Sequence, residues 1–252
     1  HFEAGNRCFD QRVPEETNRK IVDHIADINL TYSSIARDYL LNEGLSPDRT
    51  IKIGSPMFEV LHSQKKEINN SKILNKLKLG SGKYFLISCH REENVDNNRN
   101  FSLLIESLNE LANKYKMPII FPIHPRTKKI YNKTKLKVNK LVNFIDPLGF
   151  NDYNKLQIES FVVLSDSGTI FEESSILNFR ALNIRESHER PEAFEETSVV
   201  VTGLKIERIF QGIKILENQT TGKKRNINLV SDYNISNVSL KIERIILSHI
   251  DF

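Results

Sequence analysis

Short apolar runs alternate with longer amphipathic stretches through the middle of the chain, and this alternation constrains the fold more than any other feature. Tyr84–Ser88 (YFLIS) is the first apolar run, and Phe101–Lys116 follows it with leucines at helical spacing. Similar apolar runs recur at Pro118–Phe121, Val142–Ile145, Phe161–Leu164, Ala181–Ile184 and Val199–Thr202. Buried parallel strands joined by helices have this pattern. The sequence therefore predicts an α/β fold with a doubly wound parallel sheet.

The first 55 residues have a different pattern and are predicted to belong to a separate unit. A helix is expected over Glu15–Ile28, where Ile21, Ile25 and Ile28 recur at helical spacing, and another over Ser33–Asn42. A polar stretch with Gly80 and Gly82 precedes the first apolar run. We place the boundaries so that the chain divides into residues 1–55, residues 56–222 with a last helix over Ile206–Leu216, and a tail of residues 223–252 with a terminal helix over Val238–Ile250.

Composition narrows the class of protein. No apolar run approaches the roughly 18 to 20 residues that cross a bilayer, so no membrane span is predicted. The chain has 36 Lys and Arg against 32 Asp and Glu, and this small excess is spread along it, which gives little support for a nucleic-acid partner. Cys8 and Cys89 lie far apart without a metal-binding or redox spacing, so neither a disulfide framework nor structural zinc is expected. We therefore expect a reducing, cytoplasmic location.

The sharpest candidate site directly follows the run Phe161–Leu164. A strand that ends in a turn of small residues and opens a helix directs backbone N–H groups, hydroxyls and the positive helix end at one place. Ser167, Gly168 and Thr169 are therefore candidate phosphate ligands, and Glu173, one turn into the helix, is placed to accept hydrogen bonds from a ribose diol. A capped helix with ordinary acids in its first turn would have the same residues, and both interpretations stay open.

Charged residues at three other places are further candidates. His90 and Arg91 follow the first predicted strand at the edge where open α/β sheets bind ligands. Arg190 follows another strand, and its planar guanidinium suits a diphosphate. Glu3 and Glu15 could act as a general acid and a general base if their environments give them different pKa values. A surface histidine, a solvated charged loop and ordinary acids at a helix start are the corresponding alternatives.

Taken together and in this order, the motifs resemble the non-hydrolysing UDP-N-acetylglucosamine 2-epimerase family. The resemblance covers essentially the whole chain and runs through His1-x-Glu3-Ala4-Gly5-x-Arg7, Pro14-Glu15-Glu16-x-Asn18-Arg19, His90-Arg91-x-Glu93-Asn94, Ser165-Asp166-Ser167-Gly168 with Glu172-Glu173, and Glu189-Arg190-Pro191-Glu192. The sequences of Cys89–Asn94 and Asn183–Arg190 are most similar to those of the branch that makes UDP-N-acetyl-L-fucosamine from its C2 epimer during capsule or O-antigen synthesis.

This resemblance implies two Rossmann-like domains in the B-type glycosyltransferase arrangement, with the active site between them. It implies inversion at C2 of a UDP-linked 2-acetamido sugar through elimination and re-addition of UDP, without a metal or redox cofactor, by a homodimer. Matched motif positions imply that the catalytic residues are Glu3, Glu15 and His90 and that the substrate-binding residues are Arg91, Ser167, Gly168, Thr169, Glu173 and Arg190.

The resemblance also implies that most of the N-terminal domain is missing, because the motif at His1 lies late in that domain in the family. We therefore expect a C-terminal domain plus the end of an N-terminal domain, which folds mainly through its second domain. Little or no epimerase activity is expected from this chain alone, unless a missing N-terminal half associates with it. The alternatives are a non-catalytic remnant that binds UDP-sugars and a UDP-sugar glycosyltransferase of the same architecture.

Overall fold

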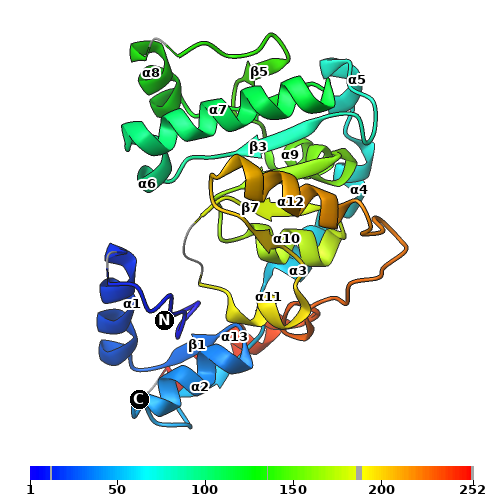
Figure 1. The fold of residues 1–252 in the computed structure, drawn as a ribbon. Helices are drawn as coiled ribbons and strands as arrows, with labels where there is room; N and C mark the ends of the chain where they lie inside the picture. Colours follow the sequence, from blue (N-terminus) through cyan, green and yellow to red (C-terminus); the bar gives the residue numbers. More distant parts are fainter. Residues whose placement is uncertain (12, 135, 186–188, 251–252) are drawn as a thin grey trace.

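Two parallel sheets organise the chain in the computed structural model, which describes residues 1–11, 13–134, 136–185 and 189–250 (Figure 1). The small sheet pairs β1 (Asn29–Thr31) with β2 (Thr50–Lys52). The large sheet has six strands in the order β5-β4-β3-β6-β7-β8. Its strands are β3 (Phe85–Ser88), β4 (Ile119–Pro122), β5 (Val142–Ile145), β6 (Val162–Ser165), β7 (Ala181–Asn183) and β8 (Val200–Val201).

Helices connect these strands. In the first unit, helix α1 (Pro14–Ile25) precedes β1, and helix α2 (Ser34–Asn42) lies between β1 and β2. Those of the large unit are α3 (Met57–Ser63), α4 (Lys65–Asn70), α5 (Ile73–Leu77), α6 (Glu92–Val95), α7 (Asn98–Tyr115), α8 (Pro125–Lys133), α9 (Phe150–Glu159), α10 (Ile170–Leu177), α11 (Pro191–Glu196) and α12 (Ile206–Leu216). A short 3-10 helix η1 (Ser231–Tyr233) and the helix α13 (Val238–His249) complete the chain.

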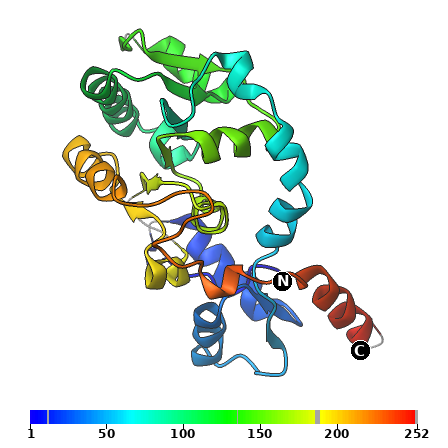
Figure 2. The ribbon, with the colours of Figure 1, turned by 90° about the vertical axis from the view of Figure 1, so that its right-hand side faces the viewer.

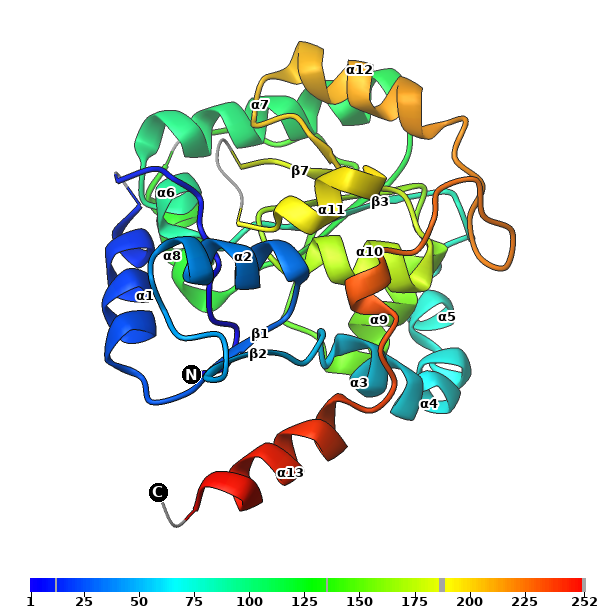
Figure 3. The ribbon, with the colours of Figure 1, turned by 90° about the horizontal axis from the view of Figure 1, so that it is seen from below.

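The large sheet confirms the predicted doubly wound fold, because all its neighbouring strands are parallel and helices cover both faces. Successive strand residues point to opposite faces. Phe85 and Ile87 of β3 therefore pack on the side of α7 and α12, whereas Leu86 packs on the side of α9 and α10 (Figure 3). Both clusters consist of almost fully buried side chains, and most of the buried apolar surface lies here.

Strand and helix limits in the large unit lie close to those predicted, and the differences have local causes. Helix α7 begins three residues before the predicted start, because the Asn97 side chain caps it by accepting from the N–H groups of Arg99 and Asn100. It ends before Lys116, which has a left-handed backbone with φ 53°. The predicted helix Ile206–Leu216 is confirmed at both ends.

The first unit differs more from the prediction. Helix α1 ends at Ile25 rather than Ile28, because Ala26 leaves helical geometry and the chain then enters β1, which the sequence pattern did not reveal. The predicted apolar stripe is not buried: the side chains of Ile21 and Ile25 are 54% and 75% exposed. The sequence pattern did not predict strand β2 either. Ile28, which was expected at the end of the first helix, packs beside the small sheet.

The chain passes between the units twice, and the two crossings lie against each other. The first crossing runs through Gly54 and Ser55, and the second runs from η1 to α13. The Ser55 N–H donates to the Asp232 carbonyl at 3.2 Å. A Cβ at Gly54, whose φ is +90°, would meet Ile235 at 2.7 Å. The two connections therefore form one tightly packed junction.

The predicted terminal helix exists and returns to the first unit. Val238 at the start of α13 is fully buried against Leu30 and Ile53, beside the small sheet. Figure 2 shows α13, in red, extending beside the blue first unit and away from the large sheet. The boundaries placed after residues 55 and 222 stay predictions. None of the helices in the described ranges is both long enough and apolar enough to cross a bilayer.

Candidate active site

The turn between β6 and α10 gathers hydrogen-bonding groups at the carboxyl edge of the large sheet. The Ser165 hydroxyl accepts the Ser167 N–H at 3.0 Å, and the Ser167 and Thr169 hydroxyls lie 2.9 Å apart. A Cβ at Gly168 would meet nothing within 4 Å, so the backbone there borders open space. Hydroxyls and N–H groups at a helix start suit a phosphate group. The three predicted phosphate ligands are thus together in one turn.

Glu173 lies one turn into α10, as predicted, and is almost fully buried. Its carboxylate accepts hydrogen bonds from Gln157 Nε2 at 2.6 Å and from Thr169 Oγ1 at 2.9 Å. Burial raises the pKa of Glu173, because the carboxylate loses water that the two donors only partly replace. The Thr169 hydroxyl therefore links this buried acid directly to the turn between β6 and α10.

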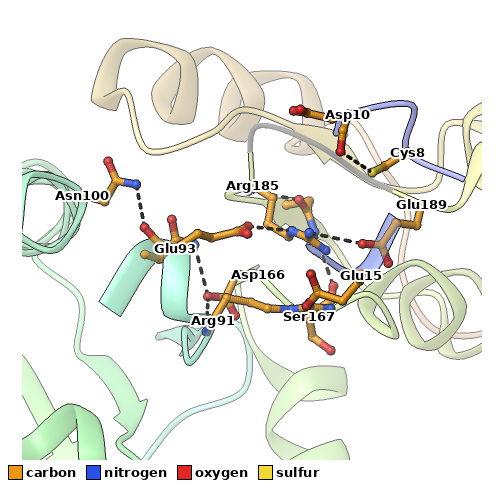
Figure 4. A network of polar contacts seen from close by, with 12 residues as sticks. Cys8, Asp10, Glu15, Arg91, Glu93, Asn100, Asp166, Ser167, Arg185 and Glu189 are labelled. Atoms are coloured by element: carbon orange, nitrogen blue, oxygen red, sulfur yellow. Dashed lines mark hydrogen bonds and ion pairs between the residues drawn. The ribbon is translucent and has the colours of Figure 1, made fainter. Parts of the chain in front are cut away.

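Asp166 joins this turn to the turn after β3, a role the sequence analysis did not assign. Its carboxylate has no solvent exposure. It accepts the backbone N–H groups of His90 and Arg91 at 3.1 and 3.0 Å and the Asn94 amide at 3.1 Å. Figure 4 shows Asp166 beside Arg91. The His90 side chain stays 54% exposed, with Nδ1 3.5 Å from Asp166. Asp166 therefore holds His90 and Arg91 beside the turn between β6 and α10.

Arg190 lies between carboxylates from both units. Its Nη2 atom lies 2.7 Å from Glu3 Oε1 and 3.1 Å from Glu172 Oε2. Burial opposes the charge on this guanidinium, but Glu172 and Glu3 outweigh it and raise the pKa of Arg190. Burial also raises the pKa of Glu172, although Arg190 acts in the opposite direction. Glu3 reaches across from a strained position, since its φ is 60°.

A second group of ion pairs also spans the two units. Arg91 lies 3.4 Å from Glu15 of α1, whose side chain is 47% exposed. Arg19 of α1 lies 2.7 Å from Glu189, which also lies 3.3 Å from Arg185. Burial raises the pKa of Glu189, but Arg19 and Arg185 outweigh it, so the pKa is lowered. The acids Glu3 and Glu15 of the first unit are thus each paired with an arginine of the second.

The comparison with known proteins decides the family. The model of the family described as UDP-N-acetylglucosamine 2-epimerase matches residues 1–247. The chain belongs to the UDP-N-acetylglucosamine 2-epimerase family. A UDP-N-acetylglucosamine 2-epimerase from Methanococcus maripaludis is 36% identical over 222 residues, which are 85% of this chain and 60% of the relative. The chain thus spans about 60% of the length of this curated relative.

Solved structures of the epimerase family have the same fold. The UDP-N-acetylglucosamine 2-epimerase from Rickettsia bellii is 48% identical and has a TM-score of 0.93, over 100% of this chain and 67% of its own. The epimerase from Methanocaldococcus jannaschii, solved with UDP-GlcNAc and UDP, is 32% identical with a TM-score of 0.88, over 98% of this chain and 68% of its own. These matches confirm the expected fold and the epimerase family, but leave the fucosamine-forming branch a prediction.

In this family member, most of the predicted site residues form three groups, each held together by its own contacts. Ser167, Gly168, Thr169 and Glu173 form the first group, Glu3 and Arg190 the second, and Glu15 and Arg91 the third. His90 contacts the first group through Asp166. Several residues in the site contacts were not predicted as site residues. Asp166 and Glu172 are two of them, although both lie inside the motif quoted above. Others are Arg19, Asn94, Gln157, Arg185 and Glu189. Residues 186–188 of the charged loop lie outside the described residues.

Among the described residues, the carboxylates of the site do not form a metal-binding cluster. In the part of the chain that the structure describes, no cluster of three or more His, Cys, Asp or Glu side chains could hold a metal ion. The carboxylates of the site pair instead with arginines and with hydrogen-bond donors of the backbone. The arrangement therefore gathers arginines and hydroxyl groups, which suit an anionic ligand, with acids close by.

Proposed function

We propose that the protein containing this sequence inverts C2 of a UDP-linked 2-acetamido sugar. A base removes the C2 proton while the bond between C1 and the UDP oxygen breaks, which gives UDP and a 2-acetamidoglycal. A proton then adds to the other face of C2 while UDP re-forms the bond to C1. The observation that supports this most is the 2.7 Å contact between Glu3 and Arg190, an acid of one unit beside a cation of the other.

The proposed nucleotide site is the edge of the large sheet. Ser167, Gly168 and Thr169 would bind a phosphate group, with Arg190 neutralising the charge that develops on the departing diphosphate. The exposed ring of His90 would contact the same diphosphate, since Asp166 holds its backbone beside the turn. Glu173 would accept hydrogen bonds from the ribose. The complex of the Methanocaldococcus relative with UDP-GlcNAc and UDP supports this substrate class.

Glu3 and Glu15 are the proposed proton carriers. Each carboxylate is paired with an arginine, Glu3 with Arg190 and Glu15 with Arg91. A bound diphosphate competes for both guanidinium groups, because phosphate oxygens are strong acceptors of the arginine fork. Once the arginines turn to the diphosphate, the two carboxylates are released from these ion pairs and become available to act on the C2 proton.

Exchange of the C2 proton tests the reaction directly. The chain is incubated with UDP-N-acetylglucosamine in heavy water, alone and together with the preceding domain of a relative, and deuterium at C2 is measured by NMR. We expect exchange in the supplemented sample and little from the chain alone. Glu3→Gln and Glu15→Gln should abolish the exchange, whereas Glu110→Gln on the exposed face of α7 should leave it unchanged. Absence of exchange in every sample would contradict the proposal.

Titration with UDP separates catalysis from binding. Calorimetry with UDP should show binding that Arg190→Ala and Glu173→Ala each weaken at least tenfold. Binding without any exchange of the C2 proton would support the non-catalytic remnant instead. A product in which the sugar has moved to an acceptor would support a glycosyltransferase.

We further propose that the sugar is the C2 epimer of UDP-N-acetyl-L-fucosamine and that the product serves surface polysaccharide synthesis. The residues Cys89–Asn94 and Asn183–Arg190 support this branch. The test compares kcat/KM for that sugar with kcat/KM for UDP-N-acetylglucosamine. A preference for UDP-N-acetylglucosamine would overturn the branch and leave the epimerase reaction in place. A homodimer is the proposed assembly.

A further inference from the structure

A pocket lies at the opposite end of the large sheet from the candidate active site. Its volume is about 400 Å³, within the range of roughly 300 to 1,000 Å³ that holds small ligands. The residues Leu61, Ile68 and Ile176, all nearly fully buried, form an apolar part of its lining. They come from α3, α4 and the last turn of α10. Since α10 starts at the carboxyl edge of the sheet, its last turn lies towards the amino edge.

Basic side chains surround the apolar part of this pocket. Lys65, Lys223 and Arg225 line it together with the apolar residues. Within the described ranges, no carboxylate forms an ion pair with any of these three cations. Burial lowers the pKa of Arg225, and no acid counters the effect. An unpaired set of cations beside an apolar surface attracts an organic anion.

Arg225 is held in place by the backbone. Its Nη1 and Nη2 atoms donate to the carbonyls of Ser175 and Ile176 at 2.7 and 2.6 Å. The Asn178 amide holds the same loop by donating to the carbonyls of Gly222 and Lys224 at 2.9 and 2.7 Å. A guanidinium carries five N–H groups, so donors remain for a ligand. The cation is therefore preorganised, which lowers the entropic cost of binding.

We propose that this pocket binds a small organic anion that has an apolar body, such as a carboxylate or a monophosphate ester. The apolar body contacts Leu61, Ile68 and Ile176, and the anionic group lies among Lys65, Lys223 and Arg225. The site is separate from the proposed nucleotide site, because it lies beyond the other end of α10. Helix α10 carries Glu172 and Glu173 at one end and Ile176 at the pocket, so a ligand here contacts the helix that positions the active-site acids.

Calorimetry of the 252-residue chain at low ionic strength tests this site with phenyl phosphate and hexanoate as probes. We expect binding of at least one probe, unchanged by saturating UDP. Inorganic phosphate and benzyl alcohol should each bind at least tenfold more weakly, because each lacks one half of the recognised chemistry. Displacement of the probe by UDP would show that it occupies the nucleotide site and would overturn the proposal.

A matched pair of variants tests the location. The double variant K65E and K223E reverses two exposed charges of the pocket and should weaken probe binding at least tenfold. The double variant K66E and K224E makes the same change of net charge at neighbouring exposed positions that do not line the pocket. It should change the affinity less than twofold. No binding of either probe, or an equal loss in both double variants, would overturn the proposal whether or not the chain binds UDP.

Discussion

Replacing Asp166 by alanine should separate the turn after β3 from the turn after β6 and destabilise the large unit. The carboxylate is fully buried and accepts from the N–H groups of His90 and Arg91 and from the Asn94 amide. A buried donor left without a partner costs about 1–3 kcal/mol. Because water can reach the two partly buried backbone groups, we expect the free energy of unfolding to fall by about 3–5 kcal/mol in total.

Urea denaturation at neutral pH measures this loss. The control is Asp146→Ala, since the Asp146 side chain is 92% exposed and its only ion pair among the described residues is with Lys128 at 3.9 Å. The control should lose at most about 0.5 kcal/mol. Asp166→Asn keeps one acceptor oxygen and should lose about 2 kcal/mol. UDP affinity should fall together with stability, because His90 and Arg91 are no longer held. A loss below about 1 kcal/mol for Asp166→Ala would refute the assigned role.

Three further outcomes are expected. Arg190→Ala leaves the buried Glu172 carboxylate without its ion-pair partner and should lower the free energy of unfolding by about 3 kcal/mol, measured in urea. Arg7 donates two hydrogen bonds to Glu43, and these lower the pKa of the Glu43 carboxyl. Wild type should therefore be more stable than Glu43→Gln above about pH 4.3, the ordinary pKa of a glutamate. The difference should vanish as the pH falls through the lowered pKa. Stability measured from pH 2 to 7 checks the sign. Gly5→Ala should lower the thermal midpoint much more than Gly44→Ala. Both glycines have positive φ, but a Cβ at Gly5 would collide with the backbone oxygen of Ala36 in α2, whereas one at Gly44 would meet nothing within 4 Å.

The large sheet was predictable because its strands consist of apolar runs. Val162–Ser165, for example, is buried at every position, and three of its residues are apolar. The small sheet gave no such signal. Its strands have three residues each, and the buried positions Asn29, Thr31 and Thr50 are polar. Packing against the rest of the first unit and α13, rather than the sequence pattern of each segment, determines that these residues form strands.

The site was predictable where its contacts are local. Ser167, Thr169 and Glu173 lie within seven positions of one another, so the turn and helix motif already places them together. Asp166 and Glu172 act on residues far away in the sequence. The Asp166 carboxylate accepts from His90, 76 positions earlier, and Glu172 pairs with Ser55, 117 positions earlier. The sequence shows that a turn contains a carboxylate, but only the folded structure shows which residue that carboxylate contacts.

The paired crossings between the units determine how the units can move. A single connecting segment permits one unit to swing and to twist, because rotation about several backbone bonds is free. Here Ser55 bonds to Asp232, and Gly54 lies against Ile235, so both segments must deform together. Two adjacent segments bend readily about the line that passes through both, but they resist rotation about any other axis. Opening and closing should therefore follow one path, which returns Glu3 to the same side of Arg190 each time.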